Sequence, residues 1–120
     1  MVVLIVASQK ELSRIWARHL ERLGHPVTIV HSQQAAVAYL RLRTVDVIVL
    51  DLTLDGGSAF AVADYASYRR PDAKVVFVTN TTFFSDGSIF KHIPNAAAIV
   101  QEKTPPNDLA AIVEYHGRAV

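Results

Sequence analysis

The sequence predicts a three-layer, doubly wound α/β domain built on a five-stranded parallel sheet. Short apolar runs alternate along the 120 residues with segments of helical periodicity, and the loops between them are short. Alternating βα units of this kind form a parallel sheet covered on both faces, with right-handed crossovers. The pattern continues over residues 1–120 without a repeat or a linker, so we expect a single domain.

Five apolar runs are the expected strands. A buried parallel strand reads as a near-continuous stretch of Val, Ile and Leu, and the run that leads to Asp51 is typical of one. The predicted strands are Val2–Val6, Val27–Val30, Val45–Leu52, Lys74–Thr79 and Ala97–Gln101.

The first helix has the clearest signals at both ends. Ser8 and Glu11 have the spacing of a capping box, and Gly24 is a natural stop. Apolar side chains recur at spacings of three and four between these points, which predicts an amphipathic helix. The side chains expected on its inner face are Leu12, Ile15, Trp16, Leu20 and Leu23.

Weaker patterns predict the other helices. One should run from about Gln33 to Arg43 and another from Ser58 to about Tyr68. The last should begin after Thr104, with Pro105 at its first helical position. Only a short fourth helix fits between Thr81 and Ile93, and we expect that stretch to be mobile.

Composition excludes several classes of function. There are no cysteines, so disulfides, thiolate metal sites and thiol nucleophiles are absent. The net charge is +1 and the basic residues are scattered, which gives little support for nucleic-acid binding. The opening apolar run is too short for a membrane span or a signal sequence. We therefore expect a cytoplasmic protein that binds neither nucleic acid nor membrane.

Polar residues follow four of the five predicted strands at one edge of the sheet. In open α/β sheets, ligands bind outside the carboxyl ends of the strands. The residues that meet there are Ala7-Ser8, Asp51, Thr79-Asn80 and Glu102-Lys103. An acid, a hydroxyl and an ammonium at one edge predict a functional site. The histidines show no metal-ligand spacing, and no dinucleotide fingerprint or nucleophile elbow is present.

Four stretches of the chain carry the pattern of a known family. They are Leu12–Val27, Val47–Leu54 continuing through Gly57–Phe60, Val76–Thr79 and, more loosely, Lys103–Pro105. Through them the chain resembles the receiver domain of bacterial two-component response regulators over nearly its whole length. The resemblance implies a flavodoxin-like fold with strand order 2-1-3-4-5. It also implies that Asp51 stands at the phosphoacceptor position and that Thr79 and Lys103 contact the phosphoryl group.

The departures from the receiver pattern fall on the metal site. Receivers carry an acidic pair after the first strand, where this chain has Ala7 and Ser8. Asp51 and the Thr53 carbonyl would remain as magnesium ligands, whereas Mg²⁺ prefers several hard oxygen ligands in octahedral geometry. We therefore predict weak or absent magnesium binding. The aromatic switch residue of the family's fifth strand is also replaced, by Ile99 or Val100.

Each site residue also has an ordinary structural interpretation. Asp51 is a phosphate acceptor, a partner in a direct or water-bridged ion pair with Lys103, or simply a strand-end acid. Lys103 and Thr79 could be a solvated lysine and an ordinary strand residue, and the capping box accounts for Ser8. The stripe of Arg14, Arg18 and Arg22 is either a solvated helix face or a partner surface, since receivers dock their histidine-bearing partners there.

The predicted function is a non-enzymatic, receiver-like signalling domain that acts through regulated protein contact. Its partner would be a histidine kinase, a phosphotransfer protein or an effector. The face formed by the segment near residues 82–93, the fifth strand and the last helix is a candidate homodimer surface. The alternatives are a fully working receiver phosphorylated on Asp51 and, more weakly, a flavodoxin-like small-molecule binder.

Overall fold

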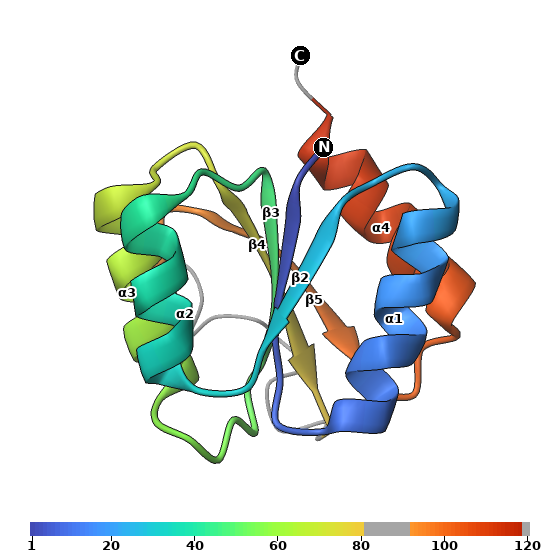
Figure 1. Ribbon diagram of the computed structural model, residues 1–120, viewed down its shortest axis with the longest axis horizontal. Coiled ribbons are helices and arrows are strands. Elements are labelled where there is room, and N and C mark those ends of the chain that lie inside the picture. The colour runs from blue at the N-terminus through green and yellow to red at the C-terminus, as the bar shows by residue number, and fades with distance from the viewer. Residues whose placement is uncertain (81–91, 119–120) are drawn as a thin grey trace.

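A computed structural model describes residues 1–80 and 92–118, and these residues form a parallel five-stranded sheet between two pairs of helices (Figure 1). The strand order β2-β1-β3-β4-β5 confirms the predicted fold class. The strands are β1 (Val3–Val6), β2 (Val27–Val30), β3 (Val47–Asp51), β4 (Lys74–Thr79) and β5 (Ala96–Gln101). The helices are α1 (Lys10–Arg22), α2 (Gln33–Leu42), α3 (Ala59–Arg69) and α4 (Pro106–Gly117).

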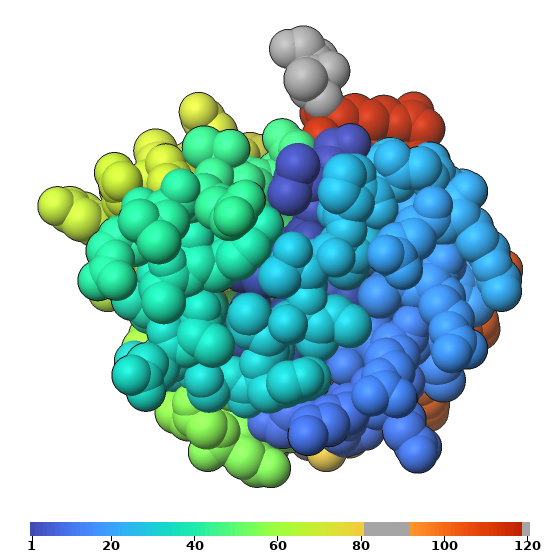
Figure 2. All heavy atoms as spheres, in the orientation of Figure 1, coloured from blue at the N-terminus to red at the C-terminus, as the bar shows by residue number. Residues whose placement is uncertain are grey.

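Each pair of helices covers one face of the sheet. Helices α2 and α3 lie on one face and α1 and α4 on the other (Figure 1). In the space-filling view, α2 and α1 form the two sides of the surface that faces the reader (Figure 2). Alternate residues of the central strands therefore enter separate cores, as the two-residue period of a strand requires. Leu50 and Phe77 pack toward α2 and α3, whereas Val49 packs with Trp16 and Leu20 of α1.

Local signals fix most of the helix ends. Ser32 and Ser58 are N-caps whose hydroxyls accept hydrogen bonds from the amides of Ala35 and Ala61. Gly24 has a φ of 91°, so it supplies the left-handed residue that ends α1. The last helix begins one residue later than predicted, because Pro105 is the N-cap and the next proline is its first helical residue.

Several sequence predictions of detail need correction. Ile15 and Leu23 are 40% and 49% exposed, because they lie at the border of the inner face of α1. The third strand is shorter than predicted and runs only over Val47–Asp51. The short fourth helix and its mobility, expected between Thr81 and Ile93, concern a stretch that lies largely outside the described residues.

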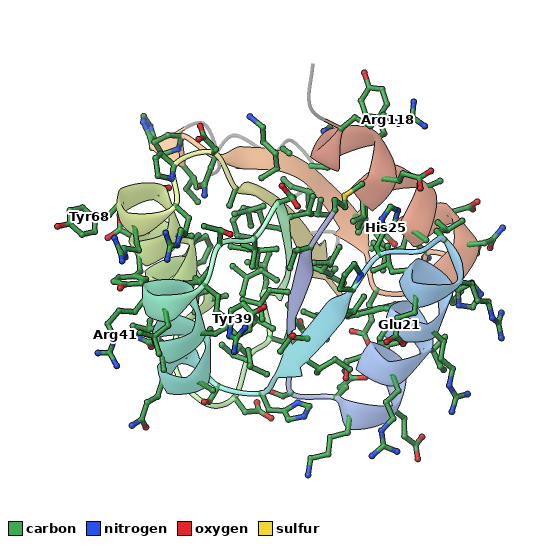
Figure 3. The ribbon with its side chains drawn as sticks, turned by 45° about the horizontal axis from the view of Figure 1, so that its top comes forward. Glu21, His25, Tyr39, Arg41, Tyr68 and Arg118 are labelled. Atoms are coloured by element: carbon green, nitrogen blue, oxygen red, sulfur yellow. The ribbon has the colours of Figure 1, made fainter. Side chains whose placement is uncertain are left out.

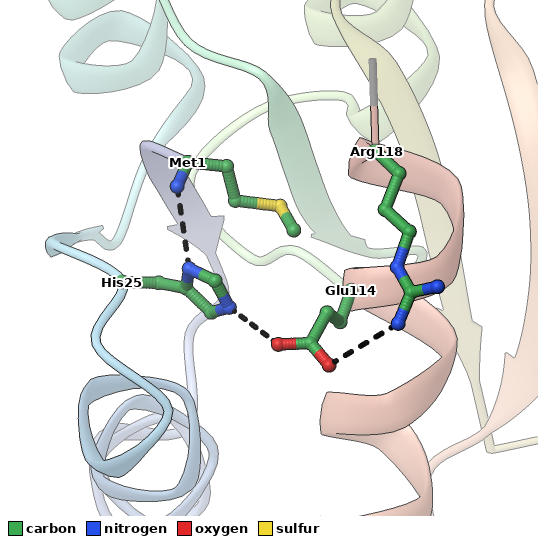
Figure 4. Close-up of polar contacts among 4 residues, drawn as sticks. All are labelled: Met1, His25, Glu114 and Arg118. Carbon is green, nitrogen blue, oxygen red and sulfur yellow. Dashed lines mark hydrogen bonds and ion pairs between the residues drawn. The ribbon is translucent and has the colours of Figure 1, made fainter. Parts of the chain in front are cut away.

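The amino edge of the sheet is closed by a polar cluster (Figure 4). His25, which precedes β2, places Nε2 2.8 Å from Oε2 of Glu114 on α4. The nitrogen of Met1 lies 3.2 Å from Nδ1 of the same ring, and Arg118 lies 3.8 Å from the other oxygen of Glu114. This cluster joins the start of the sheet to the last helix, at the edge opposite Asp51.

Candidate functional site at the carboxyl edge of the sheet

Asp51 and Thr79 lie side by side at the carboxyl edge of the sheet. They end the neighbouring strands β3 and β4, in which Asp51 pairs with Val78. Both are almost fully buried, with exposed fractions of 2% and 4%. Because polar side chains are rarely this buried without hydrogen-bond partners, their surroundings decide what the site can do.

Asp51 is held by the residue two positions after it. Its Oδ1 accepts hydrogen bonds from the Thr53 amide at 2.9 Å and from the Thr53 hydroxyl at 2.7 Å. An Asp at the start of a turn commonly accepts from the backbone two residues on. These two bonds stabilise the carboxylate and fix its orientation. The Thr53 hydroxyl was not predicted from the sequence, where only its carbonyl was considered.

Ser8 has a different role from the predicted one. The N-cap of α1 is Gln9, which makes no side-chain capping bond, so the predicted capping box is wrong. Instead the Ser8 hydroxyl accepts a hydrogen bond of 2.8 Å from the amide of Asp55, in the loop after β3. A serine therefore ties two loops together where the receiver pattern has an acid.

Further hydrogen bonds connect the loop after β3 to the loop after β2. The amide of Gln33 donates to the carbonyl of Gly56 at 2.7 Å, and the Gln33 side chain accepts from the Ser58 amide at 2.9 Å. Gly57 has a φ of 119° and packs against the Gln33 side chain. His31 also contacts the Ala7 carbonyl, at 2.8 Å. The three loops around Asp51 are thus fixed to one another.

The predicted direct ion pair between Asp51 and Lys103 is wrong. Within the described residues, ion pairs of 4.0 Å or less join Glu114 to His25 and to Arg118, and Lys103 is exposed. Lys103 follows β5 in a turn closed by a hydrogen bond from the Thr104 amide to the Gln101 carbonyl. Lys103 is therefore not the partner of the Asp51 carboxylate, which Thr53 already binds.

Lys103 instead lines an open cleft beside the site. The cleft has a volume of about 620 Å³ and runs from the start of α1 to the ends of β4 and β5. Its lining is mixed, with the apolar side chains of Leu12 and Ile15 on the α1 side. The remaining lining residues are Gln9, Glu11, Thr79, Asn80, Gln101, Glu102 and Lys103. Lys103 and Thr79 therefore share one cleft, as the sequence placed them.

The residues around Asp51 do not fit a magnesium ion well. Ala7 is buried and offers no side-chain oxygen, and the Ser8 hydroxyl is a neutral ligand already used by Asp55. In the described part of the chain, no three His, Asp or Glu side chains gather as a metal site would require. Asp51 is the one carboxylate among the sequence-predicted ligands, and Mg²⁺ usually needs further anionic oxygen ligands.

The switch position on β5 is aliphatic in either register. Ile99 pairs with Phe77 and packs partly into the core beneath α2 and α3, whereas Val100 pairs with Val78 and faces the other core. The strand-end residue that pairs with Thr79 is Gln101. Strand β5 therefore has no aromatic ring that could change its conformation together with the Thr79 hydroxyl.

The arginine stripe on α1 is solvent-exposed. Arg14, Arg18 and Arg22 are exposed and lie four residues apart on the helix, so they form one charged face.

No helix in the described residues is long and apolar enough to cross a membrane.

Several solved structures that share this fold are receiver domains. No protein-family model and no curated protein sequence matches the chain. A CheY-like receiver domain protein from Methanospirillum hungatei superposes with a TM-score of 0.86 at 21% identity, covering 97% of this chain and 92% of its own. The N-terminal domain of a response regulator/sensory box/GGDEF protein from Carboxydothermus hydrogenoformans gives 0.82 at 25% identity, covering 98% and 94%. A response regulator from Burkholderia pseudomallei, solved with a phosphorylated aspartic acid and a calcium ion, gives 0.83 at 18% identity, covering 97% and 68%.

The strand order and these similarities show that the chain has the fold of CheY-like receiver domains.

Proposed function

We propose that the chain is a single-domain receiver module with a reduced metal site, and that it acts through protein contact with little dependence on phosphorylation. Asp51 stands at the phosphoacceptor position, and Thr79 and Lys103 stand at the phosphate-contact positions. The module is a signalling component and not an enzyme.

The observation that carries this proposal is the hydrogen bond from the Asp55 amide to Ser8. In this bond the Ser8 hydroxyl, which stands where the receiver pattern has a metal-binding acid, holds the loop after β3 against the loop after β1. A carboxylate that attacks a phosphoryl group meets charge repulsion, which a bound cation normally offsets. Losing one preorganised electrostatic stabiliser lowers the rate roughly a hundred- to a thousandfold. Phosphoryl transfer to Asp51 should therefore be slow.

The alternative is a working phosphoacceptor. It is supported by the burial of Asp51 and Thr79 at neighbouring strand ends, and by the cleft that leads to Thr79 and Lys103. The structure of the Burkholderia pseudomallei response regulator contains a phosphorylated aspartic acid and a calcium ion. Under this alternative, Lys103 would move toward Asp51 only when a phosphoryl group is present.

The partner surfaces belong to the proposal as well. The exposed stripe of Arg14, Arg18 and Arg22 borders the cleft side of α1 and suits an acidic helix of a histidine kinase, a phosphotransfer protein or an effector. A homodimer would use the face that contains β5 and α4.

Intact-mass measurement of phosphorylation tests the proposal. The chain is incubated with acetyl phosphate, with and without Mg²⁺, beside an Asp51→Asn control. The proposal expects slow, incomplete addition of one phosphoryl group, with a rate that changes little when Mg²⁺ is added. Rapid, complete, Mg²⁺-dependent addition that is lost in Asp51→Asn would establish the alternative.

A further inference from the structure

A basic and aromatic surface lies at the carboxyl ends of α2 and α3, away from the Asp51 site. We call it the arginine–tyrosine patch and define it by Arg41, Leu42, Arg43, Tyr68 and Arg69. Leu42 and Tyr68 are 76% and 83% exposed, which is unusual for side chains of their size. Arg41 and Tyr68 both point away from the body of the molecule on the same side (Figure 3).

The two helix ends of the patch are joined by hydrogen bonds from arginine to backbone. Arg69 donates to the Arg41 carbonyl at 3.0 Å, and Arg70 donates to the Leu40 carbonyl at 2.8 Å. These bonds satisfy the last carbonyls of α2, where a cation also opposes the negative end of the helix dipole. The patch is therefore preorganised, so a partner would not have to order it.

Within the described residues, the arginines of the patch have no acidic partner. The ion pairs of the described residues all involve Glu114, so none of these arginines is neutralised by an acid within 4.0 Å. Arg43 lies over the ring of Tyr39, 6.0 Å from its centre, which orients its side chain. Tyr65 and Tyr68 form a ring pair 6.5 Å apart, which steadies the exposed ring. Arginines and large exposed side chains together are typical of protein interfaces.

We propose that the arginine–tyrosine patch docks an acidic segment of a partner protein that also carries an apolar or aromatic side chain. Carboxylates would bind the guanidinium groups of Arg41 and Arg43, and the apolar side chain would pack against Leu42 and Tyr68. The complementarity of charge is the argument for this occupant.

The same charges argue against the other occupants. A second copy of the chain in a two-fold contact would place the arginines of the patch against themselves. A nucleic acid needs many phosphate contacts, and a chain with a net charge of +1 offers little long-range attraction to a polyanion.

Selection from a random phage-displayed peptide library tests the proposal. Peptides that bind the Arg41→Glu/Arg43→Glu variant are first removed, and the remainder are selected on the unaltered chain. We expect the selected peptides to be acidic and to contain an apolar or aromatic residue. Neutral or basic selected peptides, or an absence of peptides that depend on the patch, would overturn the proposal.

One selected peptide is then synthesised and labelled, and its affinity for each variant measures how much the replaced side chains contribute to binding. Arg41→Glu/Arg43→Glu should weaken binding by about tenfold or more, the milder Arg41→Gln/Arg43→Gln should weaken it less, and higher salt should weaken it further. Tyr68→Ala should also weaken it, because it removes the apolar contact. The matched control is Lys10→Glu/Arg118→Glu, which reverses two exposed charges outside both the patch and the arginine stripe of α1 and should leave binding unchanged.

Circular dichroism and cooperative unfolding establish that each variant is folded. We expect them to fold, because the carbonyls of α2 are capped by Arg69 and Arg70, which are not replaced. Tighter binding of single-stranded DNA or of phosphatidylserine vesicles than of the peptide would assign the patch to those ligands and reject a protein partner. Equal loss of peptide binding in the Lys10→Glu/Arg118→Glu control would show that the peptide does not bind at the patch.

Discussion

At the carboxyl edge of the sheet, Asp51 is buried and bound by Thr53, while Lys103 lies exposed in the adjoining cleft and forms no ion pair with it. At the amino edge, the partly buried Glu114 contacts both His25 and Arg118. The first edge keeps opposite charges apart beside an open cleft, whereas the second uses them to join the sheet to α4. Within the described residues, the ion pairs therefore lie at the amino edge of the sheet. The charged side chains at the candidate functional edge form none.

The largest expected effect concerns Gly24 and Gly57, the two glycines with positive φ among the described residues, one at each edge of the sheet. Gly57, beside Asp51, lies at 119°, and a Cβ there would collide with the Gln33 side chain. Gly57→Ala should therefore destabilise the fold by about 1–3 kcal/mol from backbone strain, with the collision adding to it. Gly24→Ala, where a Cβ would meet open space, is the matched control and should cost less. Urea denaturation measures both, and an equal or reversed order would show that the loop after β3 is not rigid.

A smaller effect is expected from the amino-edge pair. Glu114→Gln removes the charge that faces His25 and Arg118, and should lower the free energy of unfolding by about 1 kcal/mol, since the pair is only partly buried. Glu21→Gln is the control, because Glu21 is exposed and forms no ion pair among the described residues. Thermal unfolding of the two variants compares them. If Glu114→Gln lowers the free energy of unfolding no more than Glu21→Gln does, the polar cluster does not stabilise the fold.

The smallest effect is expected between Asp51 and Lys103. In a double-mutant cycle of Asp51→Asn and Lys103→Gln, the coupling free energy should be below about 0.5 kcal/mol, as for side chains that do not touch. The corresponding cycle of His25→Gln and Glu114→Gln should give about 0.5 kcal/mol or more, because those side chains are in contact. A coupling free energy above about 1 kcal/mol between Asp51 and Lys103 would show that the two side chains do form an ion pair.

The sequence was a good guide to the sheet and to the edge where polar residues gather. The strand Lys74–Thr79 is bounded as predicted, because buried parallel strands have a strong apolar signature, and the partly buried edge strand Val27–Val30 is bounded as predicted as well. The position of Asp51 and Thr79 at one edge follows from that topology alone.

The sequence could not reveal which hydrogen bonds the site residues make. Ser8 and Glu11 have the spacing of a capping box, yet the Ser8 hydroxyl is used by Asp55, which is 47 residues away along the chain. A local pattern cannot register a competing long-range partner. Similarly, the strand end places Lys103 near the site, but the sequence could not reveal that Lys103 lines the adjoining cleft without an ion pair to Asp51.

Magnesium titration followed by the amide resonances of Asp51 and Thr53 tests the reduced metal site most directly. The unaltered chain is compared with Ala7→Asp/Ser8→Asp, which restores the two missing acids, and with Ser8→Ala, which breaks the Asp55 bond without adding charge. We expect no saturation of the unaltered chain or of Ser8→Ala below about 1 mM, and an affinity at least about tenfold higher for the double variant, because Mg²⁺ needs the added carboxylates. Saturable binding by the unaltered chain well below millimolar concentrations would contradict the account.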